Sequence, residues 1–393
     1  MRQLGMLFLV FFHCALSAQT MQIGVLRQVI SKKVLFSYFE GSYLIMGDSK
    51  SFGAILPTES VSVEVAPNNK VKLVKGLTVL GEFSKVSLQA TGNRHAIRVK
   101  NLIPDVKERK YEDDFTIVNA SNSLTIVNVV SIEDYLCGVV ESEGGGGRHE
   151  EYYKVQSIMS RTYAMKYASR HKKEGFQLCD QVHCQAYHQK LTYTPEIRKA
   201  VKETDQQVML DQHGKLVDGF FHANCGGQTS EPHYVWNEAI PYLTSFKDTF
   251  CIHTKQAKWQ VRIPKSSWEK YLVEQFAFPI HDSSYIHKLY TFEQPDRLAF
   301  YNGAELGIPL RDIRTKFNLK STFFETYLDG EEVVLNGRGF GHGVGLCQEG
   351  AMRMAKAGYN ALQILKFYFP GVSIRIKNNL DYFEQPEKSP FDF

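Results

Sequence analysis

The stretch Ser131–Gly147, SIEDYLCGVVESEGGGG, separates two kinds of sequence and decides how the chain is divided. Before it, from about residue 20 to 130, apolar and polar residues alternate in short runs between Gly, Asn and Pro. Such runs occur at 34–40, 60–65, 70–74, 96–99 and 124–130. Alternation with a period of two predicts half-buried strands. The stretch itself is predicted to be one more apolar strand, which ends at Glu141 and Glu143.

After the four glycines the pattern becomes helical. Apolar residues recur at helical spacing from Tyr152 to Met165, and two lysines then precede Gly175, as is typical where a helix ends. A helix is therefore predicted over 149–171. Glu141 and Glu143 would then lie at a strand-to-helix junction, next to glycines that allow a close approach of other groups.

The predicted fold class is α+β, with a central helix and C-terminal helices. The predicted divisions are a β-rich N-terminal region at 19–118, a mixed domain at 119–375 and a tail at 376–393. The mixed domain contains a less recognisable insert at about 253–330. Strands are expected to dominate between 200 and 330, with one helix at about 265–276; the C-terminal helices are expected at 347–356 and 360–368.

Residues 1–18, MRQLGMLFLVFFHCALSA, have the layout of a secretory signal peptide. Arg2 precedes an apolar run, which gives way to small residues up to Ala18. The run is shorter than the roughly 20 residues of a membrane span. Cys14 follows Phe-Phe-His rather than small residues, which disfavours a lipoprotein anchor. The chain is therefore expected to be exported to the periplasm or cell envelope.

The composition is that of an ordinary globular protein. The chain has 393 residues, 43% hydrophobic and 22% charged, with a formal net charge of +4. It contains no Lys/Arg block of the kind that binds nucleic acid, so no nucleic-acid partner is expected. A mildly basic exported protein suits a neutral or polyanionic polymer.

Two segments are candidates for chemistry. A glutamate beside Gly144–Gly147 is a candidate general acid with a raised pKa, or else a solvated surface group. The glycine-alternating segment 337–345, GRGFGHGVG, lacks the Lys and Ser/Thr of a phosphate-binding loop and has the wrong spacing for a dinucleotide fold. It predicts a tight bend, in which His342 is a candidate ligand, base or structural hydrogen-bonding group.

Six ordered motifs resemble those of the SpoIID family, the exported peptidoglycan-acting proteins related to stage II sporulation protein D and to amidase enhancers. The resemblance covers about 119–372. The motifs are SIEDYLCGVVESE (131–143), KVQSIMSRTYAM (154–165), FQLCDQVHCQAY (176–187), FFHANCGGQTS (220–230), PYLTSFKD (241–248) and GRGFGHGVGLCQEGAMRMAKAG (337–358).

This resemblance implies a catalytic glutamate at Glu143. It implies a lytic transglycosylase that cleaves the MurNAc–GlcNAc β-1,4 bond of glycan strands, with one glutamate as general acid and then base. The alternative within the family is a non-catalytic amidase enhancer that binds peptidoglycan and has a cell-wall amidase as partner. Family members usually follow this Glu with Met and often Pro. The four glycines here predict a more flexible backbone beside the acid.

The segment 176–187 places Cys179, His183 and Cys184 where they could face one metal from a turn. It resembles a family motif that binds zinc in some members, and by the same resemblance His171 is the fourth ligand. A closed set of four ligands would make the zinc structural. A Cys179–Cys184 disulfide and free thiols are the alternatives.

The predicted glycan contacts are Gln156, Arg161, Tyr163, His222 and His342. For Arg161 and Tyr163 the alternatives are a buried charge with a carboxylate partner and a core aromatic. For His222 and His342 the alternative is bracing of two glycine-rich loops. Cys225 could pair with Cys251 or Cys347, and the sequence does not choose between them.

Overall fold

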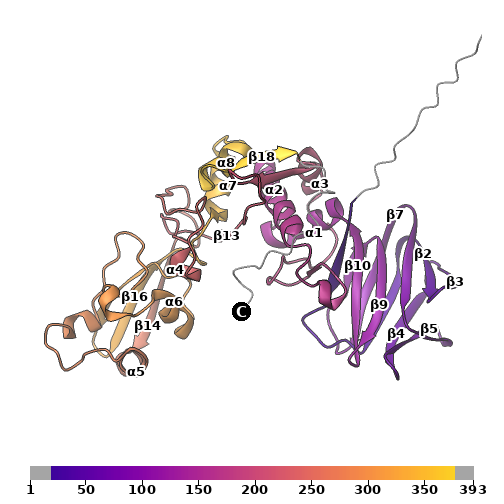
Figure 1. The fold of residues 1–393 in the computed structure, drawn as a ribbon, viewed down its shortest axis with the longest axis horizontal. Coiled ribbons are helices and arrows are strands. Elements are labelled where there is room, and N and C mark those ends of the chain that lie inside the picture. The colour runs from indigo at the N-terminus through magenta and orange to yellow at the C-terminus, as the bar shows by residue number, and fades with distance from the viewer. Residues whose placement is uncertain (1–18, 377–393) are drawn as a thin grey trace, which may run out of the picture.

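A computed structural model describes residues 19–376, except for the side chains of residues 93 and 94. The predicted signal peptide, Cys14 and all but the first residue of the predicted tail lie outside the described residues. The fold is α+β, as predicted. A large sheet lies at one end of the molecule, a small sheet lies at the other, and helices lie between them (Figure 1). Among the described residues, none of the helices combines the length and the apolar character needed to span a membrane.

The large sheet contains eleven strands in the order β11-β1-β10-β9-β7-β2-β4-β5-β6, with β3 and β8 paired to β2 and β7. The strands are β1 (Thr20–Val25), β2 (Lys33–Gly47), β3 (Lys50–Ile55), β4 (Ser60–Ala66), β5 (Lys70–Lys75), β6 (Thr78–Phe83), β7 (Val86–Ile103), β8 (Arg109–Glu112), β9 (Asp114–Ala120), β10 (Ser123–Ser131) and β11 (Leu178–Cys179). The predicted boundary at 118–119 falls inside β9, and the sheet continues through β10. All five runs of alternating sequence lie in strands.

The stretch that follows the sheet is a helix, α1 (Ile132–Gly144), and the predicted strand is wrong. Its buried apolar residues recur at helical spacing: Ile132, Tyr135, Leu136, Val139 and Val140. Ser131 caps the helix, because its hydroxyl accepts the Asp134 N–H at 3.1 Å. The short apolar run LCGVV fits a strand as well as a helix, so the helical spacing of the apolar residues is not evident from the sequence. Glu141 and Glu143 therefore lie in the last turn of a helix.

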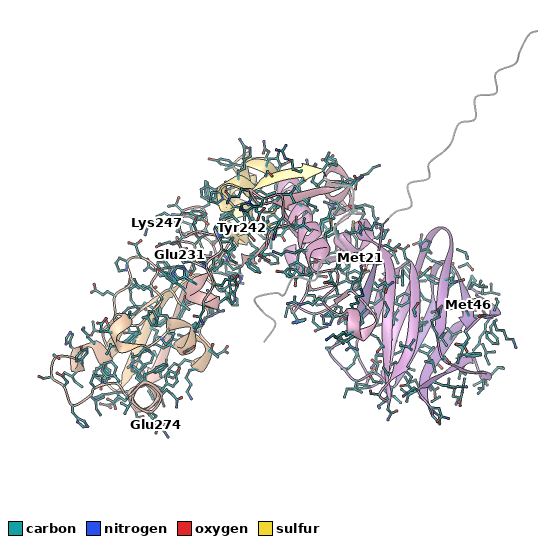
Figure 2. The ribbon with its side chains drawn as sticks, viewed as in Figure 1. Met21, Met46, Glu231, Tyr242, Lys247 and Glu274 are labelled. Carbon is teal, nitrogen blue, oxygen red and sulfur yellow. The ribbon has the colours of Figure 1, made fainter. Side chains whose placement is uncertain are left out.

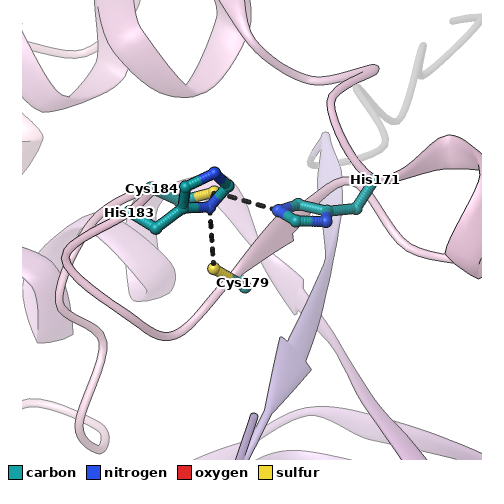
Figure 3. Close-up of side chains that lie close together, drawn as sticks. All are labelled: His171, Cys179, His183 and Cys184. Atoms are coloured by element: carbon teal, nitrogen blue, oxygen red, sulfur yellow. Dashed lines mark hydrogen bonds between the residues drawn. The ribbon is translucent and has the colours of Figure 1, made fainter. Parts of the chain in front are cut away.

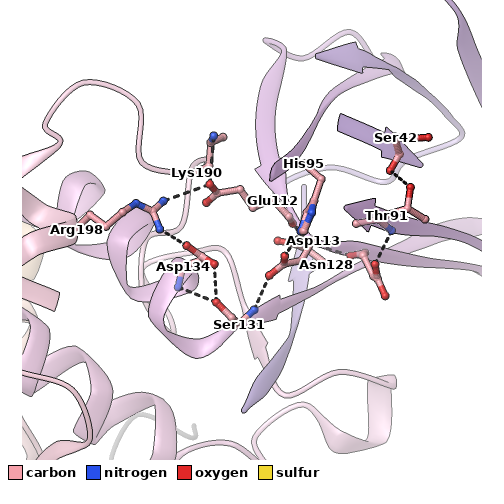
Figure 4. Close-up of polar contacts among 12 residues, drawn as sticks. Ser42, Thr91, His95, Glu112, Asp113, Asn128, Ser131, Asp134, Lys190 and Arg198 are labelled. Carbon is pink, nitrogen blue, oxygen red and sulfur yellow. Dashed lines mark hydrogen bonds and ion pairs between the residues drawn. The ribbon is translucent and has the colours of Figure 1, made fainter. Parts of the chain in front are cut away.

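A polar network fixes the start of α1 to the sheet (Figure 4). The Ser131 backbone N–H donates to Asp113 at 2.7 Å. Arg198, on α3 (Glu196–Glu203), pairs with Asp134 and with Glu112, the latter at 3.2 Å. This network anchors the N-terminal end of α1, and packing against the central helix and α3 positions the rest of the helix.

The central helix, α2 (Glu150–Lys166), ends five residues before the predicted residue 171. Residues 167–171 form turns, and His171 precedes a short 3-10 helix, Lys172–Glu174. α2 packs against α1, α3, α7 (Gln348–Lys356) and α8 (Ala361–Tyr368). The two C-terminal helices agree with the prediction to within one residue. β12 (Gln207–Leu210) pairs with β18 (Ser373–Ile376), and β13 (Phe221–His222) pairs with β17 (Leu346–Cys347).

Residues 258–338, called the insert below, form a small body with its own core around the buried Trp268. It contains β14 (Lys258–Pro264), β15 (Phe324–Asp329), β16 (Glu332–Arg338), α5 (Lys265–Phe276) and α6 (Leu310–Lys316). This range overlaps the predicted insert at about 253–330 and extends beyond it to include β16. α5 agrees with the prediction. The expected dominance of strands from 200 to 330 is wrong, because turns and short helices, including α4 (His233–Trp236), occupy most of this range. The segment marked by Glu231, Tyr242 and Lys247 connects the helices to the insert (Figure 2).

The capping of α1 gives a test of the fold. Ser131→Ala removes the hydroxyl that accepts the Asp134 N–H, so we expect the free energy of unfolding to fall by about 1 kcal/mol. Ser84→Ala, at an exposed turn position, serves as the control and is expected to change it by less than about 0.5 kcal/mol. Urea denaturation measures both. Equal effects from the two changes would contradict the assignment of Ser131 as a helix cap.

Candidate functional site

Glu143 lies where two cavities meet. Each cavity has a volume of about 430 Å³, and each is lined in part by this half-buried residue. One is polar and charged, and its lining includes Arg148, His149, Gln348, Arg353 and Lys356. The other is mainly apolar, and its lining includes Met159, Tyr163, Phe220, Phe221 and His342. Glu143 is therefore shared by the linings of both cavities.

The environment of Glu143 favours a protonated carboxyl group. Burial raises the pKa of Glu143, and a hydrogen bond from the Ala186 backbone N–H to Oε1, at 2.8 Å, partly opposes that rise. The bond fixes the orientation of the carboxyl group through one oxygen and does not involve the other, Oε2. The group can therefore hold a proton and present it in a defined direction.

Glu141 has a different role, although it lies only two residues away. Its carboxylate accepts three backbone N–H groups, from Thr192 at 2.8 Å, Tyr193 at 2.9 Å and Thr194 at 2.8 Å. These bonds hold the loop that leads into α3. Since its oxygens are occupied by the backbone, Glu141 is a structural residue, and Glu143 is the candidate acid.

The four-glycine loop after Glu143 is held by hydrogen bonds. The Tyr153 hydroxyl donates to Gly145 O at 3.2 Å and accepts the Arg148 N–H at 2.9 Å. Gly145 and Gly147 have φ values of 66° and 69°, which disfavour other residues. The loop is therefore a defined turn rather than the flexible segment that the sequence suggested.

The side chains of His171, Cys179, His183 and Cys184 converge, and their ligand atoms all lie within 4.8 Å of one another (Figure 3). The sulfur-to-nitrogen distances are 3.3 Å for Cys184–His171, and 3.7 Å for both Cys179–His183 and Cys184–His183. Tetrahedral zinc, with Zn–S of about 2.3 Å and Zn–N of about 2.0–2.1 Å, requires about 3.6 Å between such atoms. The four side chains fit that geometry.

The surroundings of this cluster also suit a metal. The His171 Nδ1 lies 2.5 Å from a Glu174 carboxylate oxygen, so the Nε2 atom is the one that faces Cys184. Glu174 in turn pairs with Arg27 at 2.7 Å. A carboxylate behind a histidine is the usual way of orienting a metal ligand. The hydrogen bond between the two thiols lowers the pKa of Cys179 and raises the pKa of Cys184, so it favours a thiolate at Cys179 alone.

The cluster is connected both to the sheet and to Glu143. Asp180, buried beside Cys179, accepts the Leu26 and Arg27 N–H groups at 2.8 and 3.2 Å and pairs with Arg109 at 2.8 Å. At the other end of the loop, Ala186 is only two residues from Cys184. The loop that carries the two cysteines therefore also carries the hydrogen-bond donor that orients Glu143.

Two of the predicted glycan contacts lie beside Glu143. Tyr163 and His342 line the apolar cavity. The Tyr163 hydroxyl donates to His183 O at 3.3 Å and accepts from Arg170 at 2.6 Å, so its ring forms cavity wall. His342 donates from Nε2 to Phe221 O at 3.0 Å and accepts the Val344 N–H at Nδ1 at 3.1 Å. Burial lowers the pKa of His342 to about 4, so the ring is neutral near pH 7.

The other three predicted contacts are buried and do not reach the cavities. Arg161 has no exposed surface; it bonds Glu133 at 2.7 and 3.2 Å and the Thr204 carbonyl at 2.7 Å. Gln156 bonds the Tyr152 hydroxyl at 3.2 Å inside the core. His222 bonds Val344 O at 3.0 Å, and burial holds its pKa well below the usual range. These residues brace the site, and Arg161 has the carboxylate partner that the alternative interpretation expected.

Some site residues had no signal in the sequence. The Ala186 N–H is a backbone group and cannot be recognised from residue type. Gln348, whose Nε2 lies 3.5 Å from Glu143 O, stands beside Cys347, just after the glycine-alternating segment 337–345. Arg148 and His149 follow the four glycines and line the polar cavity.

Comparisons with known proteins now identify the family. The family described as "Stage II sporulation protein" (SpoIID) matches residues 120–210. A stage II sporulation protein D of Bacillus amyloliquefaciens is 30% identical over 305 residues, which cover 71% of this chain and 83% of that protein. The chain belongs to the SpoIID family. Its Bacillus subtilis namesake is 29% identical over 271 residues, 63% of this chain and 75% of that protein. SpoIID membership supports a peptidoglycan-related function.

A more distant SpoIID relative carries a different name. The amidase enhancer of Bacillus subtilis is 25% identical over 292 residues, which cover 61% of this chain but only 40% of that protein. SpoIID proteins similar to this chain therefore bear both names, one referring to sporulation and one to an amidase.

The raised pKa of Glu143 predicts a pH-dependent stability effect. The folded state binds a proton at Glu143 more tightly than the unfolded chain does, so the wild type loses stability as pH rises from the ordinary glutamate range through the raised pKa. Glu143→Gln keeps the Ala186 hydrogen bond and removes this cost. We expect the variant to melt at a higher temperature at pH 7, with the gain vanishing at acid pH.

The control for this effect is Glu196→Gln, at an exposed glutamate on α3. Solvent surrounds that carboxyl group, so its replacement should give no comparable pH-dependent gain. Differential scanning calorimetry from pH 3 to pH 8 compares the two. An unchanged or lower melting temperature for Glu143→Gln at pH 7 would contradict the proposed environment of Glu143.

Proposed function

We propose that this protein is an exported lytic transglycosylase that cleaves the β-1,4 bond between MurNAc and GlcNAc in peptidoglycan glycan strands. The observation that carries the proposal is the half-buried Glu143, with a raised pKa, at the meeting point of two cavities. SpoIID membership supports the substrate class. Cell-wall glycan lies outside the cytoplasm, which agrees with the export signal expected in residues 1–18.

The chemistry needs one carboxyl group in two protonation states. The protonated Glu143 donates its proton to the oxygen of the leaving GlcNAc as the bond to the MurNAc anomeric carbon breaks. The C6 hydroxyl of the same MurNAc then attacks that carbon, and the Glu143 carboxylate accepts the hydroxyl proton. The product is a 1,6-anhydro sugar, and Glu143 is again protonated. Because the attack is intramolecular, no second carboxylate is needed to activate water.

The two cavities have the characters that such a substrate needs. The apolar cavity, with the Tyr163 ring and Phe221, can pack against sugar faces and N-acetyl methyl groups. The polar cavity carries Arg148, Arg353 and Lys356, whose positive charges suit the lactyl carboxylate of MurNAc. Gln156, Arg161 and His222 hold the walls in place without touching the glycan.

We also propose that His171, Cys179, His183 and Cys184 hold a structural zinc ion. When bound, zinc would cross-link the loop 179–184 to the segment that follows α2, and it would supply no chemistry, because all four ligands come from the protein. The role of the chain's own residues is positional: the loop presents the Ala186 N–H to Glu143.

An amidase-enhancing role is the second candidate. The similarity to the Bacillus subtilis amidase enhancer favours it. In that role the two cavities would bind glycan without cleaving it, and a cell-wall amidase would be the partner. An increase in amidase rate that persists in Glu143→Gln, without cleavage of sugar by the wild type, would support this role over the first.

The principal test is product analysis on glycan strands stripped of stem peptides. We expect the purified wild type to release fragments with 1,6-anhydromuramic ends, detected by mass spectrometry. Glu143→Gln should lower the rate by about 100-fold or more, because the proton donor is lost. The wild-type rate should fall as pH rises through the raised pKa of Glu143, since only the protonated form donates.

The matched control is Glu141→Gln, two residues earlier on the same helix turn. Glu141 binds the backbone of residues 192–194 and not the cavities, so this variant should keep most of the activity at temperatures where it is folded. Intact strands with the wild type, or equal losses in both variants, would refute the assignment of Glu143 as the acid.

The zinc site predicts a coupling between metal and rate. Cys184→Ser should lose one equivalent of zinc and lower the cleavage rate, because the loop that carries Ala186 is no longer fixed. Cys137→Ala changes a buried cysteine on α1 that is not one of the four proposed ligands, and it should retain its zinc. Metal analysis and product analysis measure the two effects. A Cys179–Cys184 disulfide in the native protein, with zinc content unaffected by Cys184→Ser, would exclude this site.

A further inference from the structure

A second cluster of metal-binding groups lies outside the site described so far. The sulfur atoms of Cys225, Cys251 and Cys347 and a carboxylate oxygen of Asp248 all lie within 4.8 Å of one another. None of the four residues has any exposed surface. They come from three segments: the loop after β13, the connecting segment near residue 250, and the residue that caps α7.

We propose that these four residues form a second structural metal site, with three thiolates and one carboxylate, for zinc or an ion of similar preference. This second site depends neither on zinc at His171, Cys179, His183 and Cys184 (the His171 cluster) nor on the glycan-cleaving activity. The Cys225 sulfur lies 3.3 Å from the Cys251 sulfur and 3.3 Å from Asp248 Oδ2. Tetrahedral zinc needs about 3.8 Å between sulfurs and about 3.6 Å from sulfur to oxygen, so a small outward movement accommodates the ion.

Backbone amides point at the sulfur atoms. The Cys225 and Gly350 N–H groups donate to Cys347 Sγ at 3.3 and 3.4 Å. Cys347 also lies at the N-terminus of α7, where the helix dipole favours negative charge. Such donors stabilise thiolates, the form in which cysteine binds a metal. On binding, the three thiols would release their protons to solvent.

The charge around the cluster fits thiolates better than thiols. Arg297 is buried, and it donates to the carbonyl oxygens of Cys225 and Gln228, both at 2.7 Å, and to the Thr322 hydroxyl at 3.3 Å. These acceptors are uncharged, and a buried guanidinium group needs a compensating negative charge. Three thiolates and a carboxylate around a divalent ion leave the site negatively charged, and Arg297 stands beside it.

Asp248 is held in the manner of a metal ligand. The Tyr368 hydroxyl donates to Oδ2 at 2.9 Å, and the Phe250 N–H donates to Oδ1 at 3.0 Å. Outer hydrogen bonds of this kind fix the orientation of a coordinating carboxylate. A buried carboxylate that faces three sulfur atoms has no hydrophobic role.

A disulfide accounts for fewer of these features. The Cys225–Cys251 sulfur distance of 3.3 Å is well above the 2.05 Å of a disulfide bond. Forming that bond would use two of the three cysteines and would leave Cys347 and Asp248 facing it, with the contact between the Cys225 thiol and Asp248 lost. A metal ion satisfies all four groups at once.

A metal ion at this site would cross-link three segments of the chain. It would join the loop after β13, the connecting segment and α7, all of which contribute residues to the lining of the polar cavity. Asn224, next to Cys225, already links these segments, since its Nδ2 atom donates to Thr254 at 2.8 Å and to Glu349 at 2.7 Å. Gln348, next to Cys347, lies beside the Glu143 carbonyl. The metal would therefore fix the part of the cavity lining that these three segments form.

The test uses the full chain, expressed with zinc and purified under mild reduction, with metal counted by plasma mass spectrometry. Cys225→Ser and Cys347→Ser should each bind one equivalent less zinc than the wild type, with unchanged circular dichroism. Cys137→Ala serves as the cysteine control. A second variant, with Cys179 and Cys184 both changed to Ser, lacks the cysteine ligands of the first site. It should still bind one Co²⁺ at the second site. The thiolate-to-cobalt charge-transfer band should then have the intensity expected for three sulfur ligands.

If the Cys225 or Cys347 variants fail to fold, the cobalt measurement still tests the proposal, because the Cys179→Ser, Cys184→Ser variant retains all four ligands of the second site. A zinc count that does not change in folded Cys225→Ser and Cys347→Ser would overturn the proposal. So would the absence of a cobalt band in the folded Cys179→Ser, Cys184→Ser variant, or a Cys225–Cys251 disulfide found by peptide mapping of the native wild type. None of these outcomes depends on cleavage of glycan.

Discussion

The hydrogen bond from the Ala186 N–H to the Glu143 carboxyl group is the contact on which the site depends. Burial alone would raise the pKa of Glu143 but would leave its direction undefined. The bond fixes one oxygen while opposing only part of the rise in pKa, so the carboxyl group has a defined orientation and a raised pKa together. Positioning and protonation have separate physical causes here, and both are needed for general-acid chemistry.

Two sulfur-rich clusters lie on segments that contact Glu143. Ala186 follows Cys184 of the first cluster, and Gln348 follows Cys347 of the second. The helix that carries Glu143, α1, is anchored to the large sheet at Ser131 by Asp113. We infer that the large sheet and the two clusters act as three fixed supports for one acid. The insert contributes Arg297 to the second cluster, which gives it a structural role at the site.

The sequence predicted the fold class, the central helix, α5 and the C-terminal helices. The choice of Glu143 over Glu141 comes from the family motif and stays a prediction, because the two carboxyl groups do not differ in local sequence. In the structure their environments differ, since Glu141 is bound to three backbone amides. The sequence predicts a strand where α1 lies, because LCGVV, a short apolar run, fits a strand as well as a helix. The sequence signal that favours the helix is Ser131, which caps it.

Other site features depend on contacts between distant segments, which no local pattern contains. Arg161 was expected near the glycan or near a carboxylate, and only the fold brings Glu133 to it across 28 residues. Gln156 and His222 have the residue types of sugar contacts, yet the packing of α2 and β13 buries them. Cys225 was known to have two candidate partners; the structure brings both together with Asp248, a residue that no cysteine count could suggest.

Direct titration of Glu143 tests the central claim most sharply. With ¹³C-labelled glutamate, the Glu143 carboxyl signal can be assigned by its absence in Glu143→Gln and followed by NMR as pH changes. The account predicts a midpoint clearly above the ordinary glutamate value of about 4.3. A midpoint at or below that value would contradict it, because the carboxyl group would then hold no proton to donate near neutral pH.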